Sequence, residues 1–139
     1  MSTQKDKFRT LAESYGLVKD DFFKAPQGFW IITRTGVEKI QRGIGATVHF
    51  ETIPEFSDVD KGLYVVKAQG FIEMKRPNEK TGKAEEVVKV VESFGEASPK
   101  NCRNSYPIAM AEKRALARVV LKMADLYELG VYSEDEMSE

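Results

Sequence analysis

Cysteine, histidine and tryptophan are scarce in this sequence, which contains one of each among its 139 residues. The single cysteine, Cys102, cannot form an intrachain disulfide, which fits a reducing compartment. The single histidine, His49, excludes histidine-rich zinc sites and triads that use several histidines. A phosphate-binding Gly-x-x-x-x-Gly-Lys-Ser/Thr loop and a dinucleotide fingerprint are also missing. We therefore expect no cofactor and no enzymatic activity.

Long apolar runs are absent, and so are the patterns of a signal or transit peptide. We expect a cytoplasmic protein without a membrane partner. Neither sign of charge dominates, since the net charge is −1 and the sequence pI is about 6.0. This balance argues against a generally basic nucleic-acid coat, so any such binding must come from a local patch.

Apolar periodicity predicts two short helices and one short strand in the first third of the chain. Residues 4–15 have the pattern of an amphipathic helix that ends at Gly16. After a loop at residues 17–27, residues 29–32 predict a strand. A capping-box spacing at residues 35–38, Thr-Gly-Val-Glu, then predicts a helix of about two turns that ends at Gly43 or Gly45.

From Thr47 the apolar period changes to two, which predicts strands at residues 47–53, 63–75 and 85–96. A long helix follows, with Ser105 or Asn104 as its cap and Pro107 in its first turn. Successive antiparallel strands usually pair with their neighbours. We therefore expect an α+β fold, an antiparallel β-meander of three to four strands with a long C-terminal helix packed across one face and short helices before it.

The long helix and the turn before it hold six basic residues and one acidic residue between positions 99 and 124. The basic residues are Lys100, Arg103, Lys113, Arg114, Arg118 and Lys122. Arg114, Arg118 and Lys122 follow at i,i+4 steps and so share one row, which Lys113 borders. A solvated helix face is the ordinary explanation, but such faces usually mix both signs. The single sign favours an anion-binding row.

The order of elements and one motif resemble a known family. Residues 95–98, Gly-Glu-Ala-Ser, end the last strand, and residues 111–118, Ala-Glu-Lys-Arg-Ala-Leu-Ala-Arg, lie on the helix. With residues 36–45 as further support, they resemble the single-strand annealing proteins, which include the phage Erf, Redβ and Sak types and the eukaryotic recombination mediator Rad fifty-two. The resemblance covers residues 29–124 as an order of elements and the motif as sequence.

Such proteins form rings or filaments that bind single-stranded DNA in a basic groove and anneal complementary strands without nucleotide hydrolysis. The resemblance implies an ATP-independent, homo-oligomeric protein of DNA recombination and repair, of phage or prophage origin. Lys113 and Arg114 match the basic pair on the family's helix, Arg118 follows at the matching offset, and Arg34 corresponds to a basic residue before the short helix. The candidate DNA-binding residues are Lys113, Arg114, Arg118, Lys122, Arg103, Lys100 and Arg34.

Lysine and arginine along a groove neutralise phosphates, and an aromatic side chain there stacks on bases without sequence preference. Tyr106 and Phe94 are the nearest aromatic candidates, with a core position as the alternative for each. Residues 133–139 carry four acidic side chains and predict an acidic, disordered tail after a single domain at residues 1–132. A sharper hypothesis is that this tail competes with DNA for the basic row or docks a protein partner.

Two other functions stay open. The same fold could be a protein-interaction or structural phage domain whose basic row meets an acidic partner. A metal-dependent nuclease would use Glu73 and Lys75 of one strand with Asp58 or Asp60, although strand alternation produces Glu-x-Lys easily. DNA affinity that falls steeply with salt separates annealing from protein interaction. Magnesium-dependent cleavage that Glu73→Ala abolishes would favour the nuclease.

Overall fold

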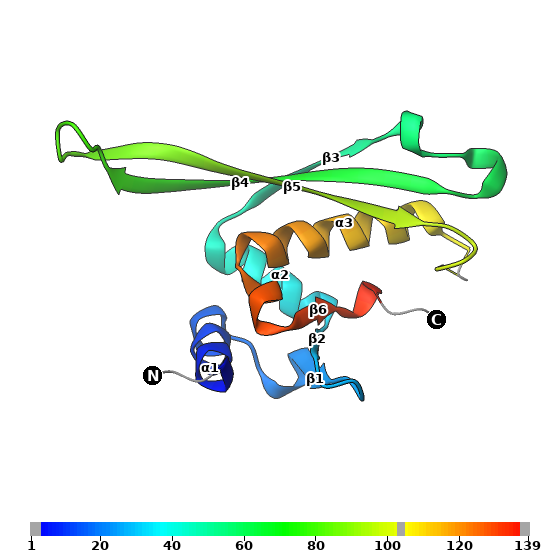
Figure 1. Ribbon diagram of the computed structural model, residues 1–139, viewed down its shortest axis with the longest axis horizontal. Coiled ribbons are helices and arrows are strands. Elements are labelled where there is room, and N and C mark those ends of the chain that lie inside the picture. Colours follow the sequence, from blue (N-terminus) through cyan, green and yellow to red (C-terminus); the bar gives the residue numbers. More distant parts are fainter. Residues whose placement is uncertain (1–3, 103–104, 137–139) are drawn as a thin grey trace.

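A computed structural model of the chain describes residues 4–102 and 105–136. The α-helices of this part are α1 (Gln4–Tyr15), α2 (Arg34–Ile44) and α3 (Pro107–Met123). Its strands are β1 (Phe22–Lys24), β2 (Trp30–Ile32), β3 (Thr47–Thr52), β4 (Tyr64–Pro77), β5 (Ala84–Ala97) and β6 (Val131–Ser133). Figure 1 shows the sheet β3-β4-β5 as the top layer, α3 beneath it, and α2, the second sheet and α1 below. The expected α+β class and the helix across the meander are confirmed.

The larger sheet contains the three strands that the period-two pattern predicts, and β4 pairs antiparallel with both neighbours. The β4–β5 register runs from Tyr64 opposite Ala97 to Pro77 opposite Ala84. Pairing with β3 covers only residues 66–71 of β4. The rest of the hairpin, residues 72–89, projects beyond the end of α3 and is called the hairpin arm below (Figure 1).

Small residues let α3 lie close to the sheet. Ala111 and Ala115 are fully buried against Gly95 of β5, where an added Cβ would overlap their backbone atoms. Apolar residues that recur at helical spacing predict one buried face of this helix, and most of them are buried: Ala111, Ala115, Val119, Val120 and Met123. Leu116 of this face is half-buried, and Ile108 is 53 % exposed. No helix in the described part of the chain is long and apolar enough to cross a membrane.

A second sheet, in which β2 lies between β1 and β6, was not predicted. The strand at Trp30–Ile32 was predicted, but β1 and β6 were not, because three residues are too few to show a period of two. The pairing of β2 with β6 is parallel and sets Trp30 opposite Val131 and Ile32 opposite Ser133. The sheet therefore ties the end of the described chain to its first third.

The predicted boundary of an acidic, disordered tail at residue 133 differs from the structure. Ser133 belongs to β6 and is fully buried, and Glu134–Glu136 form a short 3-10 helix, η5. The buried Asp135 donates from its backbone N to Ser133 Oγ at 3.1 Å. Composition misled the prediction because these acidic side chains have specific basic partners on α2 and α3. Residues 137–139 lie outside the described residues.

The helix caps also correct two predictions. The cap of α2 is Thr33, not Thr35, and its Oγ1 accepts a hydrogen bond from the backbone N of Gly36 at 3.2 Å. The helix is consequently longer than expected and ends at the left-handed Gly45, as predicted. At α3 the cap position is Tyr106 rather than Ser105, and the alternative candidate, Asn104, lies outside the described residues.

Candidate nucleic-acid interface

The predicted basic row of α3 lies against the outer edge of β5. Each of its three members donates a hydrogen bond to a β5 carbonyl oxygen. The pairs are Arg114 Nη1 with Glu96 at 2.9 Å, Arg118 Nη1 with Phe94 at 2.8 Å, and Lys122 Nζ with Glu92 at 3.1 Å. The spacings match because four helical residues rise about 6 Å and two strand residues about 6.6 Å. We call this set of contacts the edge ladder.

Arg114 is buried, with 4 % of its surface exposed, so the prediction that it belongs to a solvent-facing row is wrong. All three of its guanidinium nitrogens donate to groups of this chain. Besides Glu96, the acceptors are the backbone oxygen of Asp135 at 2.6 Å and the Oδ1 and backbone oxygen of Asn101 at 3.0 and 2.6 Å. Because Asn101 precedes α3, Arg114 joins the turn, the strand and the C-terminal segment to one helix.

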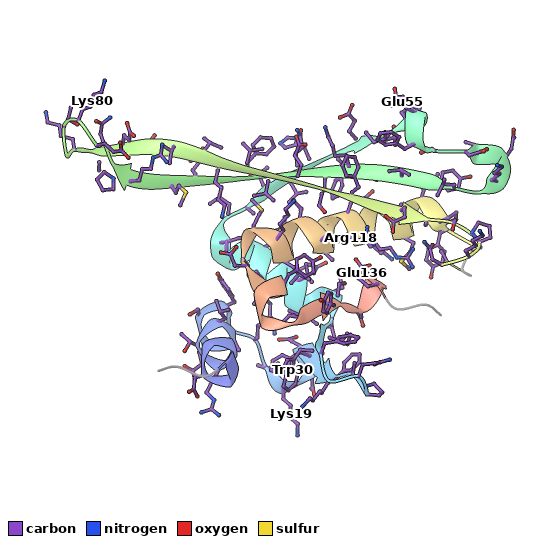
Figure 2. All side chains as sticks on the ribbon, viewed as in Figure 1. Lys19, Trp30, Glu55, Lys80, Arg118 and Glu136 are labelled. Carbon is purple, nitrogen blue, oxygen red and sulfur yellow. The ribbon has the colours of Figure 1, made fainter. Side chains whose placement is uncertain are left out.

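Arg118 lies between two carboxylates, and Figure 2 shows its side chain directed toward that of Glu136. Its Nη1 is 2.7 Å from Glu96 Oε2, and its Nη2 is 2.8 Å from Glu136 Oε2. The hydrogen bonds to Glu136 and Glu96 raise the pKa of Arg118. Conversely, the hydrogen bond from Arg118 lowers the pKa of Glu96 below its ordinary value of 4.5. Burial, and then the charge of Glu136, raise the pKa of the neighbouring Tyr127 to about 12.

Arg34 comes to the same place from α2, as the first residue of that helix. Its Nη2 is 3.2 Å from Asp135 Oδ1, and its backbone N donates to Glu134 Oε1 at 2.9 Å. Its Nε is buried and has no hydrogen-bond partner among the described residues. The fold thus brings Arg34 together with Arg114 and Arg118, three residues that the sequence only suggested as a set.

The remaining candidates are Lys113, Lys100 and Arg103. Lys113 Nζ lies 5.5 Å from the centre of the Tyr106 ring, and Tyr106 is 53 % exposed at the beginning of α3. Lys100 is exposed on the turn that leads to this helix. Arg103 lies outside the described residues. Lys113 therefore points to a different environment from its neighbour Arg114, because adjacent helical residues do not share a face.

Comparisons with known proteins give this chain no relative: no family model, no curated protein and no solved structure matches it.

Sequence reasoning missed the groups that hold the arginines. Asn101 had no assigned role, Glu96 was noted only as part of a motif, and Asp135 was treated only as part of an acidic tail that competes for the basic row. The one available signal was the pairing of an acidic run at residues 134–136 with a basic row on the preceding helix. Which carboxylate meets which arginine depends on how β6 docks beside β2, and no local pattern encodes that pairing.

The residues of the alternative nuclease site are not close together. Asp58 pairs with Leu63 in a bridge just before β4 begins, whereas Glu73 lies on the hairpin arm. Glu73 lies ten positions beyond Leu63 along the chain, which is about 33 Å of extended strand. Asp60 lies in the same turn as Asp58. This chain therefore does not bring the carboxylates and Lys75 into one metal-binding group.

Proposed function

We propose that this chain binds single-stranded DNA and anneals complementary strands as a cytoplasmic homo-oligomer, without a nucleotide cofactor. The observation that carries the proposal is the pair of Tyr106 and Lys113 at the exposed beginning of α3, with the exposed Lys100 on the turn that leads to this helix. The strand–strand–strand–helix order and the motif on α3, which resemble single-strand annealing proteins, support it.

This pair has the two chemical properties that single-stranded DNA requires. An exposed tyrosine ring can stack on any base, a contact that contributes about 1–3 kcal/mol per base in such proteins. Lysine side chains neutralise phosphates and release counterions regardless of sequence. Lys113 already lies beside the ring of Tyr106, so one nucleotide could contact both through its base and its phosphate. The expected binding is therefore sequence-tolerant and sensitive to salt.

The open edges of the hairpin arm support the oligomer. Backbone groups of successive residues in an antiparallel strand point to opposite edges, so residues two positions apart share an edge. The carbonyl oxygens of residues 92, 94 and 96 point to the outer edge of β5, where they accept the hydrogen bonds of the edge ladder. The carbonyl oxygens of Glu86, Val88 and Val90 therefore point to the same edge. In the described part of the chain, no α3 cation contacts these three oxygens. A strand from another copy could pair there, and an oligomer would align several Tyr106–Lys113 pairs along one DNA strand.

A direct test is fluorescence anisotropy of a labelled oligo-dT across a salt series in EDTA. We expect the double variant Lys100→Ala/Lys113→Ala to weaken binding roughly tenfold and to reduce the salt slope by about 0.7 for each lysine that contacts a phosphate. Lys19→Ala/Lys80→Ala removes the same charge from exposed positions elsewhere and should leave the slope unchanged (Figure 2). An annealing assay with complementary labelled oligonucleotides then tests strand pairing.

Absence of oligo-dT binding by the wild-type protein at low salt would reject DNA binding by the protein as it exists. The second candidate, a protein-interaction domain, would then be favoured by the outer face of the larger sheet. That face exposes apolar side chains on the side away from α3. They are Phe56, Val88, Val90 and Phe94. The ring centroids of Phe56 and Phe94 are 6.3 Å apart. Arg114 would not serve such a partner, because it is buried among hydrogen-bond acceptors of its own chain.

A further inference from the structure

We infer that Arg34, Arg118 and the N-terminus of α2 form a second binding site for DNA phosphates, which the chain's own Glu134–Glu136 segment occupies as an intramolecular competitor. The inference rests on the proposed DNA-binding function and adds a site that is separate from Tyr106 and Lys113. It also specifies the ligand class, the phosphodiester backbone of a single strand.

Each carboxylate of the segment has its own cationic or amide partner. Glu134 accepts from the backbone N of Arg34, Asp135 from the Arg34 guanidinium, and Glu136 from the Arg118 guanidinium. The Glu134 contact lies at the beginning of α2, where free amides and the helix dipole favour an anion. Two guanidinium groups and a helix N-terminus are the groups that proteins use to bind phosphate. Three consecutive carboxylates therefore occupy a site suited to successive phosphates.

The site has capacity that the segment does not use. Arg34 Nε is buried without a hydrogen-bond partner among the described residues, while 40 % of the Arg34 side chain stays accessible. A phosphate has more acceptor oxygens than a carboxylate and can engage a guanidinium at two nitrogens. The Asp135 carboxylate contacts one nitrogen of Arg34. Replacing it with a phosphate would satisfy a donor that is now unpaired.

Release of the segment requires only a local change. η5 is three residues long and follows β6, whose Ser133 is buried and pairs with Ile32. If Glu134–Glu136 detach, β6 can stay in its sheet. Arg114 then loses the bond from its Nε to the Asp135 backbone oxygen and keeps its bonds to Glu96 and Asn101. The helix that carries the arginines then stays in place. Because the competitor is tethered, its effective concentration is high, and a polyanion displaces it better than a single phosphate.

The main test is Glu134→Gln/Glu136→Gln, which removes two charges and preserves side-chain size. We expect this variant to bind oligo-dT roughly tenfold more tightly at low salt and to increase the salt slope by about 0.7 for each additional phosphate that the protein neutralises. The control, Glu13→Gln/Glu55→Gln, makes the same charge change at exposed positions remote in sequence. Adding Arg34→Gln to the main variant should cancel the tighter binding, since that residue forms much of the site.

An independent measurement uses the wild-type protein. Saturating oligo-dT should accelerate amide exchange at residues 134–136 and leave exchange in β6 unchanged. Two results would overturn the second site and leave the proposed function intact. One is an equal increase in oligo-dT affinity in the main and control variants. The other is that the wild type binds oligo-dT, the main variant binds it no more tightly, and amide exchange at residues 134–136 does not change on binding. Failure of every variant to bind oligo-dT would overturn both. Binding by the wild type that becomes tighter in the main variant, with the gain cancelled by Arg34→Gln, would support both.

Discussion

Lys113 and Arg114 are adjacent in sequence and differ in almost every structural respect. Lys113 is half-buried and lies beside the Tyr106 ring, whereas Arg114 is buried with its three guanidinium nitrogens bonded to this chain. The edge ladder, the turn at Asn101 and the C-terminal segment supply the acceptors of Arg114. At the scale of single residues, the two neighbours therefore divide into a Lys113 side chain at an exposed ring and an Arg114 side chain held inside the fold.

Substitution of these neighbours separates the two roles. We expect Arg114→Ala to lower the free energy of unfolding by at least ~3 kcal/mol, because carbonyl oxygens of Glu96, Asn101 and Asp135 lose their donor. Lys113→Ala should cost less than about 1 kcal/mol, since it removes one cation–π contact at an exposed ring. Urea denaturation followed by circular dichroism measures both. Equal stability losses would contradict the division of roles.

At the scale of elements, side chains of α3 form hydrogen bonds with the outer edge of one half of β5 and, among the described residues, not with the other half. The edge ladder occupies the carbonyls of residues 92, 94 and 96, and thereby blocks strand addition over that half. The hairpin arm lies beyond the helix and has no such protection among the described contacts (Figure 1). Val88 is 57 % exposed on the arm, and Val90 beside the arm is 50 % exposed. An edge of this kind can pair with a strand from a partner.

Amide exchange on β5 tests whether that partner is another copy. The outward amides of Val88 and Val90 should exchange rapidly in dilute protein and become at least roughly tenfold slower as the protein associates, because a neighbouring strand would accept their hydrogen bonds. The inward amide of Val87, which faces Met74 of β4, is the reference within the same strand. Nuclear magnetic resonance at several concentrations, beside light scattering, makes the comparison. Association without any added protection would exclude this edge as the interface.

At the scale of the whole molecule, the end of the described chain completes a sheet that begins near the start. Trp30 and Ile32 of β2 face Val131 and Ser133 of β6 across a parallel pair. The acidic segment after β6 then contacts α2 and α3. Contacts between residues 30–34 and residues 131–136 thus close the fold, and the carboxylates of residues 134–136 take part in them.

Truncation measures how much this closure contributes. We expect a chain that ends at Gly130 to lose at least about 5 °C in Tm, since burial of Val131 alone contributes about 2 kcal/mol. A chain that ends at Glu136 keeps every described residue and serves as the control. Thermal unfolding followed by circular dichroism gives both values. An unchanged Tm for the shorter chain would show that β6 adds nothing to stability.

Local pattern was sufficient to predict the larger elements. The change from a helical period to a period of two at Thr47 marked the meander, and Gly16 and Gly45 marked helix ends. Those predictions succeeded because side-chain alternation and glycine geometry act over a few residues. The cap at Thr33 was missed because Thr35 offers the same local chemistry, and the choice between them depends on where β2 ends.

The sequence by itself determined the α+β class, the three meander strands and the apolar face of α3, since each follows from spacing along one segment. Only the tertiary structure decided what the basic row does. Whether Arg114 and Arg118 face solvent depends on the position of the β5 edge and on the docking of Glu134–Glu136, which are set by pairing between residues about 100 positions apart. The spacing of basic residues along a helix predicts which of them share a face. The groups that accept their hydrogen bonds are determined by the tertiary structure.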